Sequence, residues 1–307
     1  MLFLIHVGAH KTATTHLQLS LAAQRAALRK AGVRFFGPSQ LRTEDAPGPL
    51  SAVLNPQADP ARVEAWRERL ESWLCNARRT LLSEENLPGT FTPELLFGPQ
   101  DMVYPQAAPR LERLMVLAGG HPATLLLGVR HPLDFVTSAY GMRLNGGQRP
   151  GLARYLGDFS PQRIRWSDLA GRLLAVPGVE RLVVWRFEDY PGVRPAILAE
   201  MVGPEAAGLV GLRTPDQVGW SQAAYRHLRW NYYLSWKYRV PRNVDRRMAL
   251  AREAKVRFPK GLRWPGMVLF GRRERAAADA AYARDWDALR ALPRVTALQP
   301  GATVATP

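Results

Sequence analysis

Short apolar runs alternate with longer amphipathic segments along the first two thirds of the chain. Runs bounded by polar residues predict buried strands at 2–7, 33–36, 79–83, 123–129 and 181–187. Apolar residues at helical spacing predict helices at 14–31, 60–78, 107–118, 132–144, 162–175 and 194–202. Strands that alternate with helices are typical of a parallel sheet covered on both faces. We therefore predict an α/β fold of three layers with a central parallel sheet.

Two stretches depart from this alternation. Residues 37–59 contain four prolines and two glycines, which predicts a loop or lid. After about residue 218 aromatic residues and arginines are interleaved, with few acidic residues and several prolines. We predict one domain over 1–307, with an α/β core at 1–218. The remainder, 219–307, is predicted to be a basic, aromatic-rich helical part packed against the sheet.

The residues between the first predicted strand and helix read GAHKTATT, from Gly8 to Thr15. A strand, a tight loop and a helix N-terminus form an anion site, because free backbone N–H groups and the positive end of the helix dipole converge there. In the pattern G-x-x-x-x-G-K-[ST] of nucleotide hydrolases, lysine directly precedes the last hydroxyl residue. With Gly8 as the first glycine of the pattern, Thr14 occupies the position of this lysine. Lys11 stands three residues earlier. The loop is predicted to hold a phosphate, but not as an ordinary ATP- or GTP-hydrolysing loop.

The segment HVGAHKTATTHLQ resembles the 5′-phosphosulfate loop of sulfotransferases that use 3′-phosphoadenosine-5′-phosphosulfate (PAPS), whose usual pattern is P-K-[ST]-G-[ST]-T. The residues that match are Lys11, Thr12, Thr14 and Thr15. His10 replaces the usual proline and Ala13 replaces the usual glycine. A methyl group at position 13 requires a negative φ and no close approach of a phosphate. The resemblance implies a P-loop-like fold in which residues 10–15 bind the donor and Lys11 stabilises the leaving oxygen.

A second motif, LLLGVRHPLDFVTSAYGMRL, places Arg130 just past a predicted strand and Ser138 eight residues later. A guanidinium offers forked donors to a phosphate, and a serine hydroxyl adds one more. By themselves these residues could also be a surface charge and an ordinary helix residue. The motif is similar to the 3′-phosphate site of the same family, which implies that Arg130 and Ser138 bind that phosphate. Lys260, in FPKGLRWPG, resembles a basic glycine loop that contacts the 3′-phosphate in relatives.

Two adjacent carboxylates, Glu84 and Glu85, follow the predicted strand 79–83 in RTLLSEENLPG. This position lies at the edge of the sheet where ligands bind. The segment resembles S-S-E-N-L of bacterial family members, which implies that Glu85 is the general base, with Glu84 the second candidate. An acceptor hydroxyl needs such a base because it loses its proton as it attacks sulfur. The alternative is that both carboxylates are solvated loop residues. For Glu188 and Asp189, in WRFEDY, we expect structural contacts.

Composition adds few constraints. The net charge of +16 suggests an anionic partner, but only 5 of the 42 basic residues are lysine, a bias that a GC-rich coding sequence also produces. The single cysteine, Cys75, fits a reducing compartment. The first apolar run is short and has no basic segment before it, so we expect a cytoplasmic protein without a signal peptide or membrane span. The six histidines show no paired ligand spacing, so no metal site is predicted.

The aromatic and basic stretch 220–275 has three interpretations. The first is packing by residues at near-helical spacing, namely Trp230, Tyr233, Trp236 and Tyr238. The second is an acceptor groove for an acidic glycan. The third is contact with a membrane surface through Trp264, Met267, Leu269 and Phe270. Sequence-specific nucleic-acid binding is disfavoured, because no recognition motif accompanies the charge.

The resemblance implies an enzyme that moves a sulfuryl group from PAPS to a hydroxyl or amine of a carbohydrate or glycolipid. The product nucleotide is adenosine 3′,5′-bisphosphate (PAP), and the chemistry demands no metal. Two other classes remain open. One is a phosphoryl-transferring kinase with an atypical loop. The other is a non-catalytic relative that binds an anionic glycan or lipid.

Overall fold

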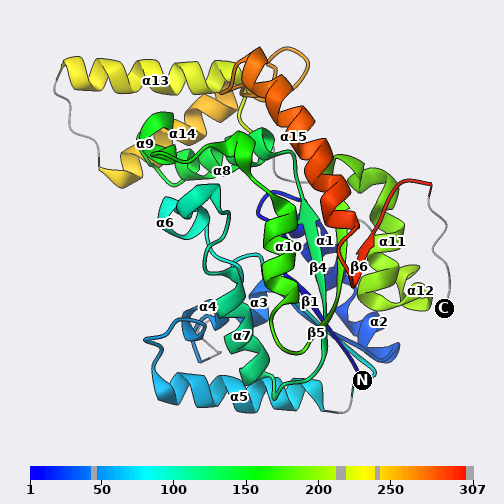
Figure 1. Ribbon diagram of the computed structural model, residues 1–307. Coiled ribbons are helices and arrows are strands. Elements are labelled where there is room, and N and C mark those ends of the chain that lie inside the picture. The colour runs from blue at the N-terminus through cyan, green and yellow to red at the C-terminus, as the bar shows by residue number, and fades with distance from the viewer. Residues whose placement is uncertain (43–46, 76, 212–218, 239–242, 302–307) are drawn as a thin grey trace.

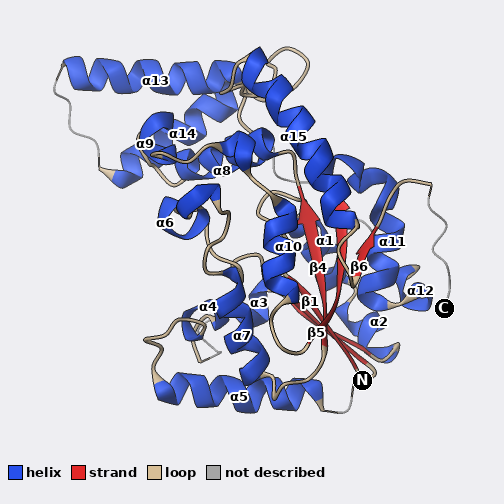
Figure 2. Cartoon of the chain, in the orientation of Figure 1, coloured by secondary structure: helices blue, strands red, loops and turns tan. Residues whose placement is uncertain are grey.

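The computed structural model describes residues 1–42, 47–75, 77–211, 219–238 and 243–301. Its strands form one parallel sheet in the order β2-β3-β1-β4-β5-β6. They are β1 (Leu2–His6), β2 (Val33–Phe36), β3 (Arg79–Ser83), β4 (Ala123–Val129), β5 (Val179–Arg186) and β6 (Val295–Ala297). Helices cover both faces of this sheet (Figures 1 and 2). The predicted three-layer, P-loop-like α/β architecture is confirmed.

The helices fall into three groups along the chain. Those before β4 are α1 (Thr14–Ala23), α2 (Arg25–Lys30), α3 (Pro38–Leu41), α4 (Leu50–Val53), α5 (Pro60–Leu74), α6 (Pro93–Leu96) and α7 (Ala107–Leu117). Those around β5 are α8 (Pro132–Asn145), α9 (Leu152–Leu156), α10 (Trp166–Leu174), α11 (Tyr190–Val202) and α12 (Pro204–Ala207). The last are α13 (Gln222–Lys237), α14 (Val244–Arg257) and α15 (Arg272–Arg290). None of these helices of the described chain is long and apolar enough to cross a bilayer.

Burial on both faces explains why the strands read as continuous apolar runs. In β1, Phe3 and Ile5 belong to a core shared with α5, α7 and α10, whereas Leu4 belongs to a second core shared with α1, α2 and α11. Adjacent strand residues point to opposite faces, so a strand between two helical layers needs apolar residues at every position.

The sheet order places all the motif-bearing segments at one edge. β1 lies between β3 and β4, and the segments that follow these three strands contain Lys11, Glu85 and Arg130 respectively. Because all the strands are parallel, their carboxyl ends lie at the same edge of the sheet. The chain leaves β1 toward one face and β3 toward the other, which makes this edge a topological switch point, where α/β sheets bind ligands.

Several predicted boundaries differ from the structure. The helix predicted at 14–31 is broken at Gln24 into α1 and α2, and the one predicted at 60–78 ends at Leu74. Within 37–59, predicted as a loop or lid, the described residues form α3 and α4, and residues 43–46 lie outside the described part. Leu41 and Leu50 are fully buried, so these turns pack on the core and do not form an open lid.

The C-terminal part contributes more to the sheet than the sequence predicts. The expectation for 219–307 was helix alone, but β6 extends the sheet in parallel beside β5, with Leu182 opposite Val295. α15 connects the helices near α13 to this strand (Figure 1). A run of only three half-buried residues carries too little hydrophobic pattern to predict a strand. The final residues, 302–307, lie outside the described part.

Asp285, in α15, fixes the start of α10. This carboxylate is buried and accepts hydrogen bonds from the backbone N–H groups of Trp166, at 2.6 Å, and Ser167, at 3.3 Å. These are N–H groups of the first turn of a helix, which have no partner within the helix itself. Burial raises the pKa of Asp285, and the hydrogen bonds from Ser167 and Trp166 oppose that shift.

We expect Asp285→Ala to lower the free energy of unfolding by about 1–3 kcal/mol, because buried N–H groups lose their acceptor. Asp285→Asn keeps one acceptor oxygen, so its loss should be smaller. Asp287→Ala serves as the control, since Asp287 is exposed in the same helix and should change stability by less than about 0.5 kcal/mol. Urea unfolding followed by circular dichroism measures all three. Equal losses at positions 285 and 287 would contradict the capping role.

Candidate active site

The loop after β1 leaves a set of backbone N–H groups without partners. Lys11 has φ of 68° and Ala13 has φ of 66°, two left-handed residues that turn the chain into α1. Among the described residues, the N–H groups of Ala13, Thr14 and Thr15 form no hydrogen bond, whereas that of Thr12 faces the Ala9 carbonyl across a tight turn. Alternating left-handed residues and a helix N-terminus both concentrate positive partial charge. This geometry is typical of an anion site, and we call residues 8–15 the anion loop.

Ala13 adopts the conformation that the sequence analysis excluded. We expected a negative φ there, but its φ is positive, as it is for the glycine usual at that position. The turn from β1 into α1 needs a left-handed residue, so Ala13 adopts this conformation at a cost of about 1–2 kcal/mol. Its methyl group packs against the core beneath α1, which offsets part of that cost.

The hydroxyl groups of the loop differ in what they contact. Thr12 is fully buried and its Oγ1 donates to the carbonyl of Ala9 at 2.6 Å, so this hydroxyl stiffens the loop. Thr14 Oγ1 is buried and has no hydrogen-bond partner in the described structure. A Cβ at Gly8 would lie 2.6 Å from that oxygen, so the loop closes tightly and only glycine fits there. Thr15 is half-buried at the start of α1.

Arg130 reaches the same loop from the end of β4. Its Nη1 donates to the carbonyl of Lys11 at 3.0 Å, and its guanidinium stacks on the ring of Phe187 at 4.4 Å. The structure thus brings the two predicted phosphate motifs together. Ser138 lies nearly two turns into α8, half-buried. Burial lowers the pKa of Arg130, and Asp134 and Glu188 oppose that shift.

Glu188 has the structural role expected of it. Its Oε1 accepts from the backbone N–H of His131, at the N-terminus of α8, at 2.8 Å. Its Oε2 accepts from the hydroxyl of Tyr282, in α15, at 3.1 Å. A carboxylate at this position stabilises the helix N-terminus that follows Arg130. The expectation of structural contacts for Glu188 is confirmed.

Lys11 lies within a group of charges from four segments. Burial lowers the pKa of its ammonium group, Glu85 opposes that shift, and Arg130 and Lys255 lower the pKa further. Lys255 comes from α14, and burial lowers its own pKa as well. Lys255 forms no ion pair with a described carboxylate. Among the described residues, no three His, Cys, Asp or Glu side chains are grouped to hold a metal ion.

Lys255 was not a candidate in the sequence analysis. Its segment, ALAREAKVRF, carries no motif, and α14 is far from the loop along the chain. The one signal in the sequence is rarity, because only five lysines occur among 42 basic residues. Only the structure, in which α14 packs against α8, shows that Lys255 lies near Lys11.

The structure distinguishes the two adjacent carboxylates. The Glu84 side chain is 2% exposed and is bound by Arg42 through two pairs, Nη2 to Oε1 at 2.6 Å and Nε to Oε2 at 2.9 Å. The backbone N–H of Asn86 also donates to Oε1, at 2.8 Å. The Glu85 side chain is 23% exposed, and its contact with Arg42 is longer, at 3.5 Å. The Glu84 carboxylate is therefore engaged in structural contacts, whereas that of Glu85 is accessible to solvent.

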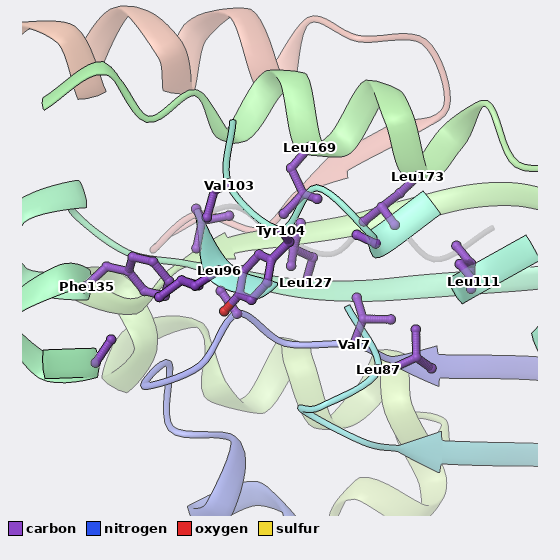
Figure 3. Packing of buried hydrophobic residues seen from close by; sticks show 14 of the residues in the cluster. Val7, Leu87, Leu96, Val103, Tyr104, Leu111, Leu127, Phe135, Leu169 and Leu173 are labelled. Atoms are coloured by element: carbon purple, nitrogen blue, oxygen red, sulfur yellow. The ribbon is translucent and has the colours of Figure 1, made fainter. Parts of the chain in front are cut away.

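His10 is fully engaged within the protein. Its backbone N–H donates to the Tyr104 hydroxyl at 3.0 Å, and Nδ1 lies 2.7 Å from the same oxygen. That hydroxyl therefore donates its own proton to Nδ1, and Nε2–H donates to Oδ1 of Asn86 at 3.1 Å. Figure 3 shows the Tyr104 ring packed among apolar side chains beside Val7. Burial lowers the pKa of His10, which keeps the ring neutral.

Direct binding of the donor by His10 stays a prediction, and this network favours an indirect role. With its N–H groups used by Tyr104 and Asn86, it has no donor left for a phosphate. Instead it connects the anion loop to the turn that contains Glu84 and Glu85. His10, at the position held by proline in the family pattern, thus links two segments that contain candidate site residues.

Lys260 lies apart from this group in the described structure. It is exposed, and its stem lies against Gly219 and Gly266, in a segment paired with the start of α13. Trp220, next to that pairing, donates from Nε1 to the carbonyl of Gly141 in α8, at 2.9 Å. No contact among the described residues joins Lys260 to Arg130 or to the loop. Its role in binding the 3′-phosphate stays a prediction.

No protein-family model matches the chain, and no curated protein matches it. Among solved structures, a sulfotransferase from Alicyclobacillus acidocaldarius is similar over 96% of this chain and 97% of that one. The identity is 16% and the TM-score is 0.44. That protein is named for the class of enzyme that the motifs resemble. At this TM-score the similarity adds no argument, and the site is interpreted from its own residues.

We expect Ala13→Gly to be at least as stable as the wild type, because glycine adopts a positive φ without strain. Ala22→Gly, at an exposed position in α1, should cost about 0.5–1 kcal/mol, since glycine weakens a helix. Chemical unfolding of both variants measures the difference, expected to be about 1–2 kcal/mol. Equal destabilisation by the two changes would show that Ala13 is not strained.

Proposed function

We propose that the chain is a sulfotransferase that moves a sulfuryl group from PAPS to a hydroxyl or amine of an acceptor. The observation that carries the proposal is the set of N–H groups without hydrogen bonds at Ala13 to Thr15, beside Lys11 and Arg130. One accessible carboxylate, Glu85, acts on Lys11 electrostatically from the neighbouring strand end. An anion site, two cations and one base are what transfer of an anionic group to an alcohol requires.

The residues fit the donor in the following way. The N–H groups of Ala13 to Thr15 hold the 5′-phosphosulfate, as a helix N-terminus holds other phosphates. Arg130 keeps further guanidinium N–H groups after its bond to the Lys11 carbonyl, and these bind the 3′-phosphate together with Ser138. Lys255 adds positive charge near Lys11, which favours a donor that carries several negative charges.

PAPS supplies the sulfuryl group, and its nucleotide leaves as PAP. Glu85 accepts the proton of the acceptor as the new S–O or S–N bond forms. Lys11 stabilises the negative charge on the oxygen that is released when the old S–O bond breaks. Burial lowers the pKa of the Lys11 ammonium group, and the carboxylate of Glu85 opposes that shift. The carbohydrate or glycolipid named above remains the proposed acceptor class.

Binding of PAP tests the donor site without an acceptor. Calorimetric titration should show binding of PAP stronger than that of magnesium-ATP or adenosine 5′-phosphate. Arg130→Ala should weaken PAP binding by about 10- to 100-fold, the size of a lost charge-assisted hydrogen bond to phosphate. Arg78→Ala is the matched control, because this exposed arginine precedes β3 at the opposite edge of the sheet.

The other outcomes are informative as well. A preference for magnesium-ATP would replace the proposal with a kinase. Absence of binding for every nucleotide would favour a non-catalytic relative that binds an anionic glycan or lipid. Circular dichroism of Arg130→Ala is needed beside the titration, since Arg130 also contacts the loop carbonyl.

Substitution of the two carboxylates is expected to affect different quantities, the turnover for Glu85 and the stability for Glu84. Glu85→Gln should lower the release of PAP from PAPS by about 10²–10⁴-fold, because the base is lost, while PAP affinity is kept. Glu84→Gln should instead lower the free energy of unfolding by about 1–3 kcal/mol, since it weakens the contacts of a buried group with Arg42. Turnover with carbohydrate acceptors and urea unfolding measure the two effects. Unchanged turnover in Glu85→Gln would remove Glu85 as the base.

A further inference from the structure

One face of α13 exposes large aromatic side chains. Trp230 is 59% exposed, Tyr233 47% and Trp236 77%. The rings of Trp230 and Tyr233 stack with their centroids 5.5 Å apart, and Tyr233 and Trp236 are 6.1 Å apart. These residues were expected first of all to pack internally, and the structure shows instead that they face outward. The internal packing is made by the opposite face, through Ala224, Tyr225, Leu228 and Ser235.

The same exposed face carries positive charge and no negative charge. At 100° per residue, the aromatic residues and the three exposed basic residues fall within an arc of about 120°. The basic residues are Arg226, Arg229 and Lys237. No Asp or Glu occurs anywhere from Gln222 to Lys237. None of the three cations forms an ion pair with a described residue, so no carboxylate neutralises their charge. Arg229 lies over the ring of Tyr225 at 5.8 Å, and Lys237 lies over that of Tyr238 at 5.5 Å.

The base of this face borders a pocket of about 300 Å³. Arg229 and Gln222 of α13 line it together with Leu269 and residues 150–152. Val268, which also lines it, is 68% exposed. The residues expected to meet a membrane, Trp264, Met267, Leu269 and Phe270, are half-buried, and the last three of them pack against the core. The outward aromatic surface is therefore that of α13, which projects from the body of the molecule (Figure 1).

We propose that this aromatic and basic face of α13 docks on an anionic lipid bilayer. Trp and Tyr prefer the boundary between lipid tails and water, because one end of each ring is apolar and the other is polar. Arg and Lys beside them are attracted to anionic head groups. Three cations and no acid complement such a surface. A second copy of the same face would meet it with like charge, which disfavours self-association there.

The docking does not depend on the sulfotransferase proposal, because it uses no residue of the anion loop. It does place the candidate active site near the lipid. α13 packs on α14, and α14 carries Lys255, which acts on Lys11.

Co-sedimentation of the full chain with lipid vesicles tests the basic part of the face. We expect binding to phosphatidylcholine vesicles that contain about one third phosphatidylglycerol, and little binding to pure phosphatidylcholine. Neutralising three charges in R226Q/R229Q/K237Q should weaken binding by a factor on the order of a hundred, about fivefold per charge. The matched control is R62Q/R67Q/R78Q, which removes the same charge from or near α5, at the opposite end of the view in Figure 1.

The aromatic part is tested with W230S/W236S at low and high salt, about 0.05 and 0.5 M. This variant should bind at least tenfold more weakly at both salts, and vesicles with brominated lipid should quench tryptophan fluorescence only in the wild type. Equal losses in the two charge variants would overturn the proposal, because net charge alone would then explain binding. So would unchanged binding by W230S/W236S, or a wild type that ignores anionic vesicles.

Two further outcomes would assign the face to another occupant. Sedimentation velocity that shows a dimer dissociated by W230S/W236S would identify a second copy of the chain, against the proposal. Binding to heparin that is lost in R226Q/R229Q/K237Q, without vesicle binding, would identify an acidic glycan and equally overturn it. All of the substituted residues are exposed, so the variants should fold, and circular dichroism confirms this.

Discussion

The site depends on one constraint: a helix must begin directly behind a buried parallel strand. The turn that makes this possible forces Lys11 and Ala13 into left-handed conformations, and it leaves the N–H groups of Ala13 to Thr15 without hydrogen bonds among the described residues. Both consequences cost free energy. Two contacts offset that cost, one within the loop and one from outside it. Thr12 binds the Ala9 carbonyl, and Arg130 binds the Lys11 carbonyl.

The same contacts couple the anion loop to the candidate base. His10 bridges Tyr104 and Asn86, and Glu84 accepts from the backbone of Asn86 while Arg42 binds its carboxylate. The turn after β3 is thus fixed from two sides, and Glu85 is presented by neighbours that cannot move independently. Buried polar groups of this kind are costly unless every member is paired, so the network specifies one arrangement. This network therefore fixes the position of Glu85, after β3, relative to that of Lys11, after β1.

The C-terminal part completes the molecule in three ways. β6 closes one side of the sheet, and α15 places Asp285 at the start of α10 and Tyr282 against Glu188. α14 adds Lys255 to the charges around Lys11. α13 is built on the same packing, but its outer face is left to solvent. The pair of α13 and α14 therefore has an inner side near the candidate active site and an outer side exposed to solvent.

The sequence by itself determined the features that depend on local pattern. Hydrophobic runs located five of the strands. The residues of GAHKTATT, and Arg130 with Ser138, marked the segments predicted to bind phosphate. Tertiary structure decided what those patterns leave open, because burial and hydrogen-bond partners come from residues far apart in the chain. Only packing shows that Glu84 is bound by Arg42 while Glu85 is accessible. Packing alone also engages His10, brings Lys255 to Lys11 and turns the α13 aromatics outward.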